Sequence, residues 1–227
     1  MFDIILIKIA IMSENLSLKI KRNVRKKKLK KFLSKYHLKN AEMKPKIDYR
    51  YNTYEGTNLL LIDELIKSHE ILQDSFIMDI GSGTGLFLLY LAEKGFNNLY
   101  GIEIDNELYN TSLFNINQMS LKNKSVLNSV HIIYGNAIQE EINENITHFY
   151  IFNSFFDEDT YLKWLLNIEK SLKKKMRKIK IILLYPTVAS IGACRKCGWL
   201  KEKRRIICKT QVCYRCVNFL IYENDIG

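Results

Sequence analysis

The chain has 227 residues, a formal net charge of +11, two prolines and ten glycines. This length suffices for one α/β domain with an extension and a substantial buried core. So few prolines and glycines exclude a fibrous chain or long low-complexity stretches. The sequence offers no apolar run long enough to span a bilayer, and we expect a cytoplasmic protein without a secretion signal.

The positive charge is concentrated near the N-terminus. Lys19 to Lys46 contain thirteen Lys or Arg and a single acid, Glu42. This pattern predicts binding to nucleic acid or to an anionic surface, and it is also typical of a solvated leader with no dedicated partner. The apolar stretch before it, Met1 to Met12, fits an interfacial anchor or a start codon assigned too early. We expect residues 1–46 to form a basic extension, partly helical or flexible, and residues 47–227 to form the main domain.

Regular elements begin after Tyr54. Apolar residues at helical spacing predict a helix from Thr57 to Leu72 that covers a sheet edge, and Tyr51 and Tyr54 ahead of it are candidates to shield a ligand or to pack in the core. An apolar stretch from Phe76 to Ile80 then predicts a buried strand.

A glycine-rich turn follows this strand, in the run Asp79-Ile80-Gly81-Ser82-Gly83-Thr84-Gly85. Glycines let the backbone approach a ligand closely. The spacing is one residue shorter than the dinucleotide fingerprint, and Asp79 would repel a pyrophosphate but suits a ligand with an ammonium and a sulfonium. An apolar helix from Leu86 to Ala92 comes next and ends near Gly95. The second strand, Asn98 to Ile102, leads to Glu103, an acid placed to bind ribose hydroxyls. Asp105 is expected to cap a helix through about Met119.

At these residues the chain resembles the class I S-adenosylmethionine-dependent methyltransferases, whose first motif is Asp/Glu-x-Gly-x-Gly-x-Gly. The resemblance runs from about Asp48 to the C-terminus and implies a methyltransferase domain that uses S-adenosyl-L-methionine. Within the superfamily, the motif sequence Asp-Ile-Gly-Ser-Gly-x-Gly with a later Asn-x-Phe is most similar to bacterial enzymes of unassigned substrate. The implied cofactor-binding residues are Asp79, Gly81, Ser82, Gly83, Gly85, Glu103, Asn136 and Ala137.

The last two of these residues follow the third strand, which begins at Val130. The resemblance implies that Asn136 and Ala137 lie at the edge of the adenine, and Asn136 occupies a position where Asp is usual. A short helix is expected from Ile138 to Ile142.

The fourth strand ends at Asn153, where the resemblance places the methyl acceptor. Methyltransferases that act on amino groups carry Asn/Asp-Pro-Pro-aromatic there. Asn153-Ser154-Phe155-Phe156 keeps the first and last positions but lacks both prolines, which argues against adenine or glutamine as the acceptor. Asn153 is therefore the catalytic candidate, and a loop-capping amide is the alternative interpretation. Methyl transfer needs mainly proximity, alignment and a dry site, so no catalytic triad is expected.

The remaining elements complete an α/β pattern. Asp157-Glu158-Asp159 opens a helix that Lys173 to Lys178 closes, and the fifth strand runs from Ile179 to Tyr185. A short helix leads to Gly198, and two strands follow near Trp199 to Ile207 and Tyr214 to Tyr222. The alternation predicts a doubly wound, mostly parallel, seven-stranded Rossmann-like sheet, and the resemblance adds that the last two strands form a closing antiparallel hairpin.

Four cysteines have the spacing of a zinc ribbon: Cys194, Cys197, Cys213 and Cys216. The expected fold places the first pair at a helix end and the second at the start of the last strand, which does not ensure that the four thiolates meet, and free cysteines are common in cores. We assign no metal site.

The function predicted is methyl transfer to an unidentified nucleophilic acceptor. A nucleic-acid-binding module, or a methyltransferase directed at RNA or DNA through the basic extension, is the main alternative. A nicotinamide-dependent enzyme is disfavoured by the glycine spacing and by Asp79.

Overall fold

The computed structural model describes residues 2–41, 54–208 and 217–225, and it describes side chains from Lys19 onward. The helices are α1 (Phe2–Tyr36), α2 (Leu59–Lys67), α3 (Leu86–Glu93), α4 (Asn106–Ser120), α5 (Val126–Ser129), α6 (Glu158–Lys174) and α7 (Val188–Lys196). The strands are β1 (Ile77–Ile80), β2 (Leu99–Glu103), β3 (Val130–Tyr134), β4 (His148–Phe152), β5 (Lys180–Leu184), β6 (Leu200–Ile206) and β7 (Phe219–Asn224).

One seven-stranded sheet organises the molecule, in the order β3-β2-β1-β4-β5-β7-β6. Strands β1 to β5 are parallel, and β7 lies antiparallel between β5 and β6. The predicted sheet with its antiparallel hairpin is therefore confirmed. Chain order reverses between β1 and β4, and open α/β sheets bind ligands beyond the carboxyl ends of the strands at such a point.

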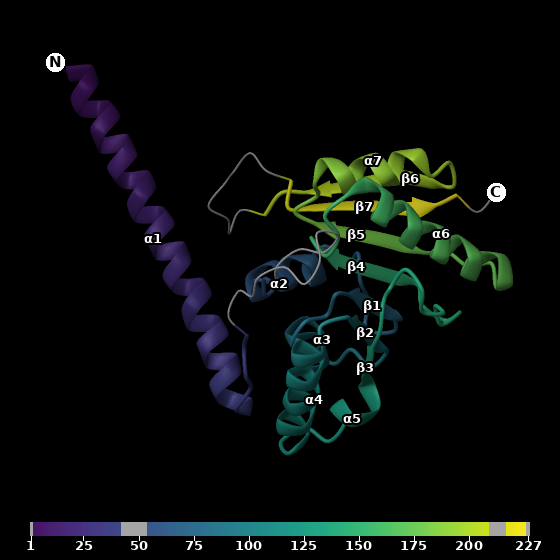
Figure 1. The fold of residues 1–227 in the computed structure, drawn as a ribbon. Coiled ribbons are helices and arrows are strands. Elements are labelled where there is room, and N and C mark those ends of the chain that lie inside the picture. Colours follow the sequence, from purple (N-terminus) through teal and green to yellow (C-terminus); the bar gives the residue numbers. More distant parts are fainter. Residues whose placement is uncertain (1, 42–53, 209–216, 226–227) are drawn as a thin grey trace.

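Helices cover both faces of the sheet (Figure 1). Alternate residues of a strand point to opposite faces. Tyr150 and Ile182 pack with α2, α3 and the end of α1, while Phe149 and Ile181 pack with α6 and α7. Both faces are thus buried, which explains why most residues of the central strands are apolar.

Polar caps set the helix boundaries as the sequence predicts. The Asp105 side chain accepts hydrogen bonds from the backbone N–H groups of Glu107 and Leu108 at the start of α4. Asp157 accepts one from Thr160 at the start of α6. Gly95, with φ +89°, follows the end of α3 in the left-handed conformation that glycine favours there.

Three local predictions were wrong in detail. The helix expected at Ile138 to Ile142 is a turn, because the Asn136 side chain accepts a hydrogen bond from the Ile138 N–H and its carbonyl accepts from Gln139. The four-residue helix α5 was not predicted. Helix α2 is shorter than expected, since Asn58 caps its start and His69, with φ +59°, follows its end.

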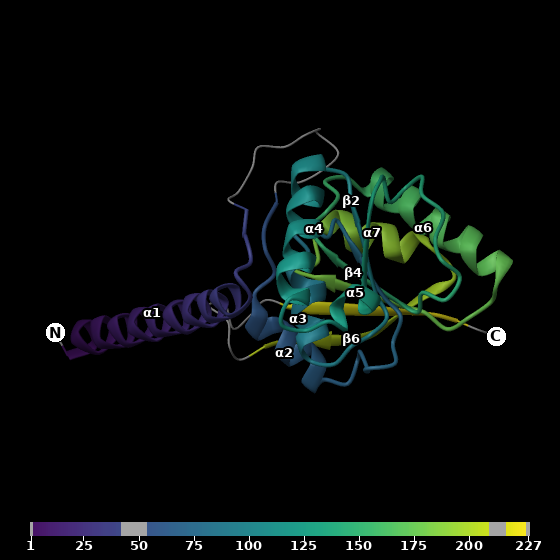
Figure 2. The same cartoon turned by 90° about the horizontal axis from the view of Figure 1, so that it is seen from below.

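Helix α1 is continuous over 35 residues and projects from the body (Figures 1 and 2). Its last turns attach it: Phe32 packs edge-to-face on Tyr90 with ring centroids 5.2 Å apart, and Lys35 pairs with Glu93 at 2.7 Å. Lys28 pairs with Asp63. None of the helices in the described part of the chain has the length and apolar run needed to cross a membrane.

Candidate functional site

The glycine-rich turn lies between β1 and α3, at the carboxyl edge of the sheet. Gly81, Gly83 and Gly85 have φ values of +73°, +55° and +76°, which side chains rarely adopt. An added Cβ at Gly83 would lie 2.2 Å from Cε2 of Tyr54, whose ring covers the turn. At Gly81 it would lie 2.7 Å from the Ser154 hydroxyl. The turn therefore needs glycine both for its conformation and for the room it leaves.

Two buried carboxylates lie beside this turn. Glu103, at the end of β2, accepts hydrogen bonds from the backbone N–H groups of Gly83 at 2.6 Å and Asp105 at 2.8 Å. Asp79, in β1, is 4% exposed. Burial, together with the charge of Glu103, raises the pKa of Asp79 well above its usual range. Burial also raises the pKa of Glu103, although its backbone hydrogen bonds oppose the change. A cationic ligand would relieve this unfavourable pair.

A small crevice lies beside Asp79 and the glycine turn. It measures about 20 Å³, and Asp79, Gly81, Ser82, Phe152 and residues 54–57 are among the residues that line it. The Ser82 hydroxyl is turned away from the ligand side, toward Gly101 of β2, where an added Cβ would lie 2.8 Å from it. Ser82 can therefore contribute backbone rather than its side chain.

Strand β3 brings the last two predicted cofactor residues to the same carboxyl edge of the sheet. The Gly135 N–H donates to the Glu103 carbonyl at 2.9 Å, so Asn136 and Ala137 follow directly beside the end of β2. The Asn136 side chain faces its own turn in this structure, through the bond to Ile138 at 3.2 Å.

Asn153 lies beyond the end of β4 and has φ +50°. Tyr185, beyond the neighbouring strand β5, also has φ +50°. A left-handed conformation is unusual for tyrosine, and strained backbone of this kind gathers at functional sites. Two adjacent strands therefore end in strained residues at the edge that carries the glycine turn.

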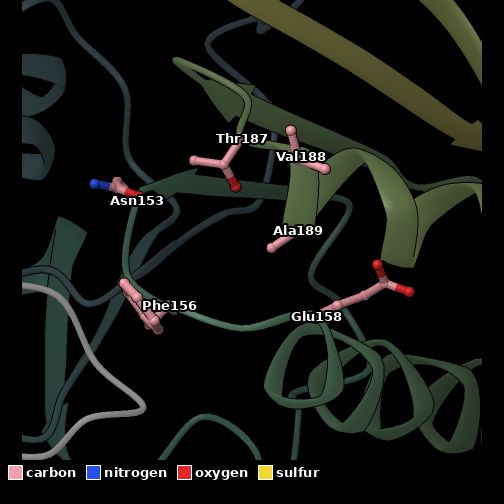
Figure 3. A pocket seen from close by; sticks show the side chains of 6 residues that line it. All are labelled: Asn153, Phe156, Glu158, Thr187, Val188 and Ala189. Atoms are coloured by element: carbon pink, nitrogen blue, oxygen red, sulfur yellow. The ribbon is translucent and has the colours of Figure 1, made fainter.

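An open pocket of about 600 Å³ begins at Asn153. Its other lining residues are Phe156, Glu158, Thr187, Val188 and Ala189. Figure 3 shows Asn153 and Thr187 at one end of the pocket and Glu158 at the other, with its carboxylate directed toward α7. There the carboxylate packs on Gly192, where a Cβ would lie 2.3 Å from Oε2, and it contacts the ammonium of Lys196.

Sequence reasoning did not assign Glu158 or Thr187 to a site. Glu158 was read only as part of an acidic helix start. For Thr187 the sequence did contain a signal. Thr187 and Ser190 form the capping box that starts α7 shortly after β5. The start of α7 therefore lies at the carboxyl edge of the sheet, where Thr187 and Asn153 line the same pocket.

Cys194 and Cys197 do not line the crevice or the pocket. Burial, and next Cys197, raise the pKa of Cys194 to about 12, so this thiol is protonated and unreactive at neutral pH. Cys213 and Cys216 lie outside the described residues. Among the side chains described for residues 19–41, 54–208 and 217–225, no three metal-binding groups come together.

Comparisons with solved structures identify the class of fold. The chain is similar to an RNA methyltransferase from Salinibacter ruber in complex with S-adenosyl-L-homocysteine, with a TM-score of 0.51 and 16% identity, over 76% of this chain and 94% of that one. It is also similar to the glycopeptide N-methyltransferase MtfA complexed with S-adenosylmethionine, with a TM-score of 0.56 and 8% identity, over 74% and 87% of the two chains. The fold is that of the Rossmann-like class I methyltransferases.

In sequence, the chain is 26% identical over 138 residues to human EEF1A lysine methyltransferase 2, and 25% identical over the same length to the mouse protein. The alignments cover 61% of this chain and 54% and 52% of those proteins, so the chain spans about half the length of the curated relatives it matches. No protein-family profile matches the chain. The predicted closeness to bacterial enzymes needs correction, because these sequence relatives are mammalian and the bacterial similarity rests on fold at low identity.

Proposed function

We propose that the chain is a methyltransferase that uses S-adenosyl-L-methionine. The observation that carries this proposal is the pair of buried carboxylates, Asp79 and Glu103, beside a turn built from three left-handed glycines. Their raised pKa values indicate a site that favours an added positive charge. A nicotinamide dinucleotide would instead bring negative charge to the same carboxylates.

The polar groups at this edge of the sheet fit such a cofactor. Asp79 suits its ammonium, Glu103 its ribose, and Asn136 with Ala137 its adenine. When bound, the cofactor supplies a methyl group already activated on a sulfonium. The chain's own residues then have to orient both partners and exclude water. Leu86, Phe87 and Phe152 supply apolar walls for this purpose.

For the acceptor we propose the amine of a lysine side chain, in the pocket between Asn153 and Glu158. Three features support this choice. The sequence relatives are named as lysine methyltransferases. Glu158, in the first turn of α6, lines the pocket and contacts an ammonium, that of Lys196. The side-chain carbonyl of Asn153 can accept a hydrogen bond from an amine and orient its lone pair.

Native mass spectrometry of the purified chain tests the cofactor, with S-adenosylmethionine, S-adenosylhomocysteine and NAD offered in competition. We expect an adenosyl ligand to be retained. Retention of NAD alone would move the chain to the oxidoreductases.

Methyl transfer from tritiated cofactor to peptides with one lysine tests the acceptor, and the same peptides with arginine serve as the control. We expect ε-N-methyllysine in the hydrolysate. Asn153→Gly removes the side chain without straining the left-handed backbone, and we expect it to lower kcat by about a hundredfold while cofactor affinity is kept. Asn128→Gly, at an exposed amide elsewhere, is the control. Label on arginine peptides, or on RNA, would contradict the lysine assignment.

For the basic residues of α1 we propose a polyanionic partner, nucleic acid or an anionic surface. Lys19, Arg22, Arg25, Lys26 and Lys27 are all exposed on the projecting helix. Such binding weakens steeply as salt is added, so retention on heparin that is lost at high salt, and lost after charge reversal of these residues, tests it.

A further inference from the structure

A buried amide joins the end of the basic arm to the glycine turn. Asn115 lies in α4 and is 0% exposed. Its Oδ1 accepts a hydrogen bond from the Lys39 N–H at 2.7 Å, and its Nδ2 donates to the Lys39 carbonyl at 2.8 Å. The same Nδ2 donates to the Thr84 carbonyl at 3.0 Å, inside the turn. One side chain therefore binds both polar backbone groups of Lys39 and one backbone group of the turn.

A second connection runs through Tyr54. Its hydroxyl donates to Oδ1 of Asn40 at 3.2 Å and lies 2.9 Å from Oγ1 of Thr84. Since a phenol has one hydrogen to donate, the Thr84 hydroxyl is the donor in the second bond. Burial, partly offset by the bond to Thr84, raises the pKa of Tyr54 to about 12, so the phenol keeps its hydrogen at neutral pH.

Thr84 is consequently held from two sides. Its carbonyl is bound by Asn115 and its hydroxyl by Tyr54, and Thr84 itself is fully buried. Both partners are also bound to the segment that leaves α1, one to Lys39 and the other to Asn40. A shift of Lys39 relative to α4 would therefore be transmitted to the turn, because buried hydrogen bonds cannot be exchanged for bonds to water without cost.

We infer that Asn115 is a positioning residue for the cofactor turn, and that Lys39 through Asn115, and Asn40 through Tyr54, form an outer part of the cofactor site. This inference rests on the proposed function. Because Asn115 touches the turn and not the ligand, its loss should weaken cofactor binding by misplacing Thr84 and its neighbour Gly83. The coupling is reciprocal, so a bound cofactor should in turn hold Lys39 more firmly.

Substitution of Asn115 tests the first part. Asn115→Asp keeps the shape but loses both amide hydrogens, and Asn115→Ala removes the bonds without burying a charge. We expect each to raise the Kd for S-adenosylmethionine about tenfold, measured by calorimetry well below the unfolding temperature. Asn117→Asp makes the same chemical change at an exposed position of the same helix, and we expect it to leave the Kd unchanged.

Hydrogen exchange on the unmodified chain tests the second part and needs no variant to fold. We expect the cofactor to slow exchange at residues 36–41, and this protection to be absent in Asn115→Ala. A lowered Tm with an unchanged Kd would mean that Asn115 stabilises the fold only, and would overturn the inference. Protection confined to the turn would overturn the link to Lys39. If the unmodified chain binds no S-adenosylmethionine, the proposed function itself fails; if it binds and the variants bind equally well, only this inference fails.

Discussion

At Gly83 the backbone determines whether the site can form. An added methyl group would meet the ring of Tyr54 at 2.2 Å and would have to sit at φ +55°. We expect Gly83→Ala to lower the free energy of unfolding by about 1–3 kcal/mol and to abolish cofactor binding, since the ring can only yield by leaving the turn. Chemical denaturation and calorimetry measure the two effects. Gly198→Ala is the control, because no atom lies within 4 Å of a Cβ there. Undiminished binding by the Gly83 variant would remove the basis of the site assignment.

The two acids give cofactor binding a defined pH dependence. In the free protein, burial raises the pKa values of both Asp79 and Glu103, and the charge of Glu103 raises that of Asp79 further. A bound cation favours their ionised forms and lowers these pKa values, so binding releases protons in acidic solution. The Kd for S-adenosylmethionine should therefore fall as the pH rises from about 5 to about 7. Calorimetry in buffers of different ionisation enthalpy measures the protons released. Asp79→Asn should flatten the dependence, and a Kd that is constant in unmodified protein would contradict this account.

The residues that we propose for the cofactor side can be named from the sequence because they are local. Asp79 and the three glycines are consecutive in the chain, and Glu103 follows the next strand. The acceptor pocket is different, because Glu158, Thr187 and Ala189 come from separate helices that only the packing of α6 on α7 brings together. No spacing along the chain encodes that contact.

At the scale of elements, the buried acid Glu70 links strands β5 and β6 to the segment that follows α2. Its side chain is almost fully buried, and the residue is 4% exposed. It accepts hydrogen bonds from Lys180 at 2.8 Å and from Arg204 at 2.9 Å. Although burial opposes it, these bonds lower the pKa of Glu70. We expect Glu70→Gln to lower the free energy of unfolding by about 2 kcal/mol, because two cations lose their charged partner.

The contribution of Glu70 depends on pH with a definite sign. Since its folded pKa lies below the unfolded value of about 4.3, its stabilisation is full above that value and is lost as the pH falls further. The difference in unfolding free energy between the Glu70→Gln variant and the unmodified chain should shrink in acid. Urea titrations at neutral and acidic pH measure it, and Glu107→Gln, at an exposed acid in α4, is the control. An equal difference at both pH values would mean that the carboxylate charge is not what stabilises the fold.

Element boundaries followed from the sequence where a side chain caps a helix, as Asp105 and Asp157 do. The prediction was wrong at Asn136, where the same kind of side chain makes a turn instead of starting a helix. In both the helix starts and the turn, a side-chain amide or carboxylate accepts a hydrogen bond from a backbone N–H. A helix forms only where the following residues present an apolar face that can pack on the sheet. Leu108 and Ile116 provide such a face in α4, whereas the residues after Asn136 include the exposed Gln139 and Glu140.

For the whole molecule, the structure separates two parts of α1. Among the α1 side chains that the structure describes, from Lys19 onward, the buried ones are Phe32 and Tyr36, which are 4% and 5% exposed and pack on the body. We expect removal of residues 2–27 to leave the Tm nearly unchanged. Removal of residues 2–36 should lower the free energy of unfolding by several kcal/mol, because two large side chains lose their burial. Differential scanning calorimetry compares the two truncations, and an equal effect would contradict the division of α1.

The same helix has a consequence for how the molecule moves in solution. At 1.5 Å per residue, 35 residues extend about 50 Å, which exceeds the diameter of a compact domain of this size. A molecule with such a projecting helix tumbles and diffuses more slowly than a sphere of equal mass. Its sedimentation coefficient should therefore be low for 26.7 kDa, and its small-angle scattering should show a long tail in the distance distribution. In gel filtration the monomer would elute early and could be mistaken for a dimer, so its mass has to be determined by light scattering.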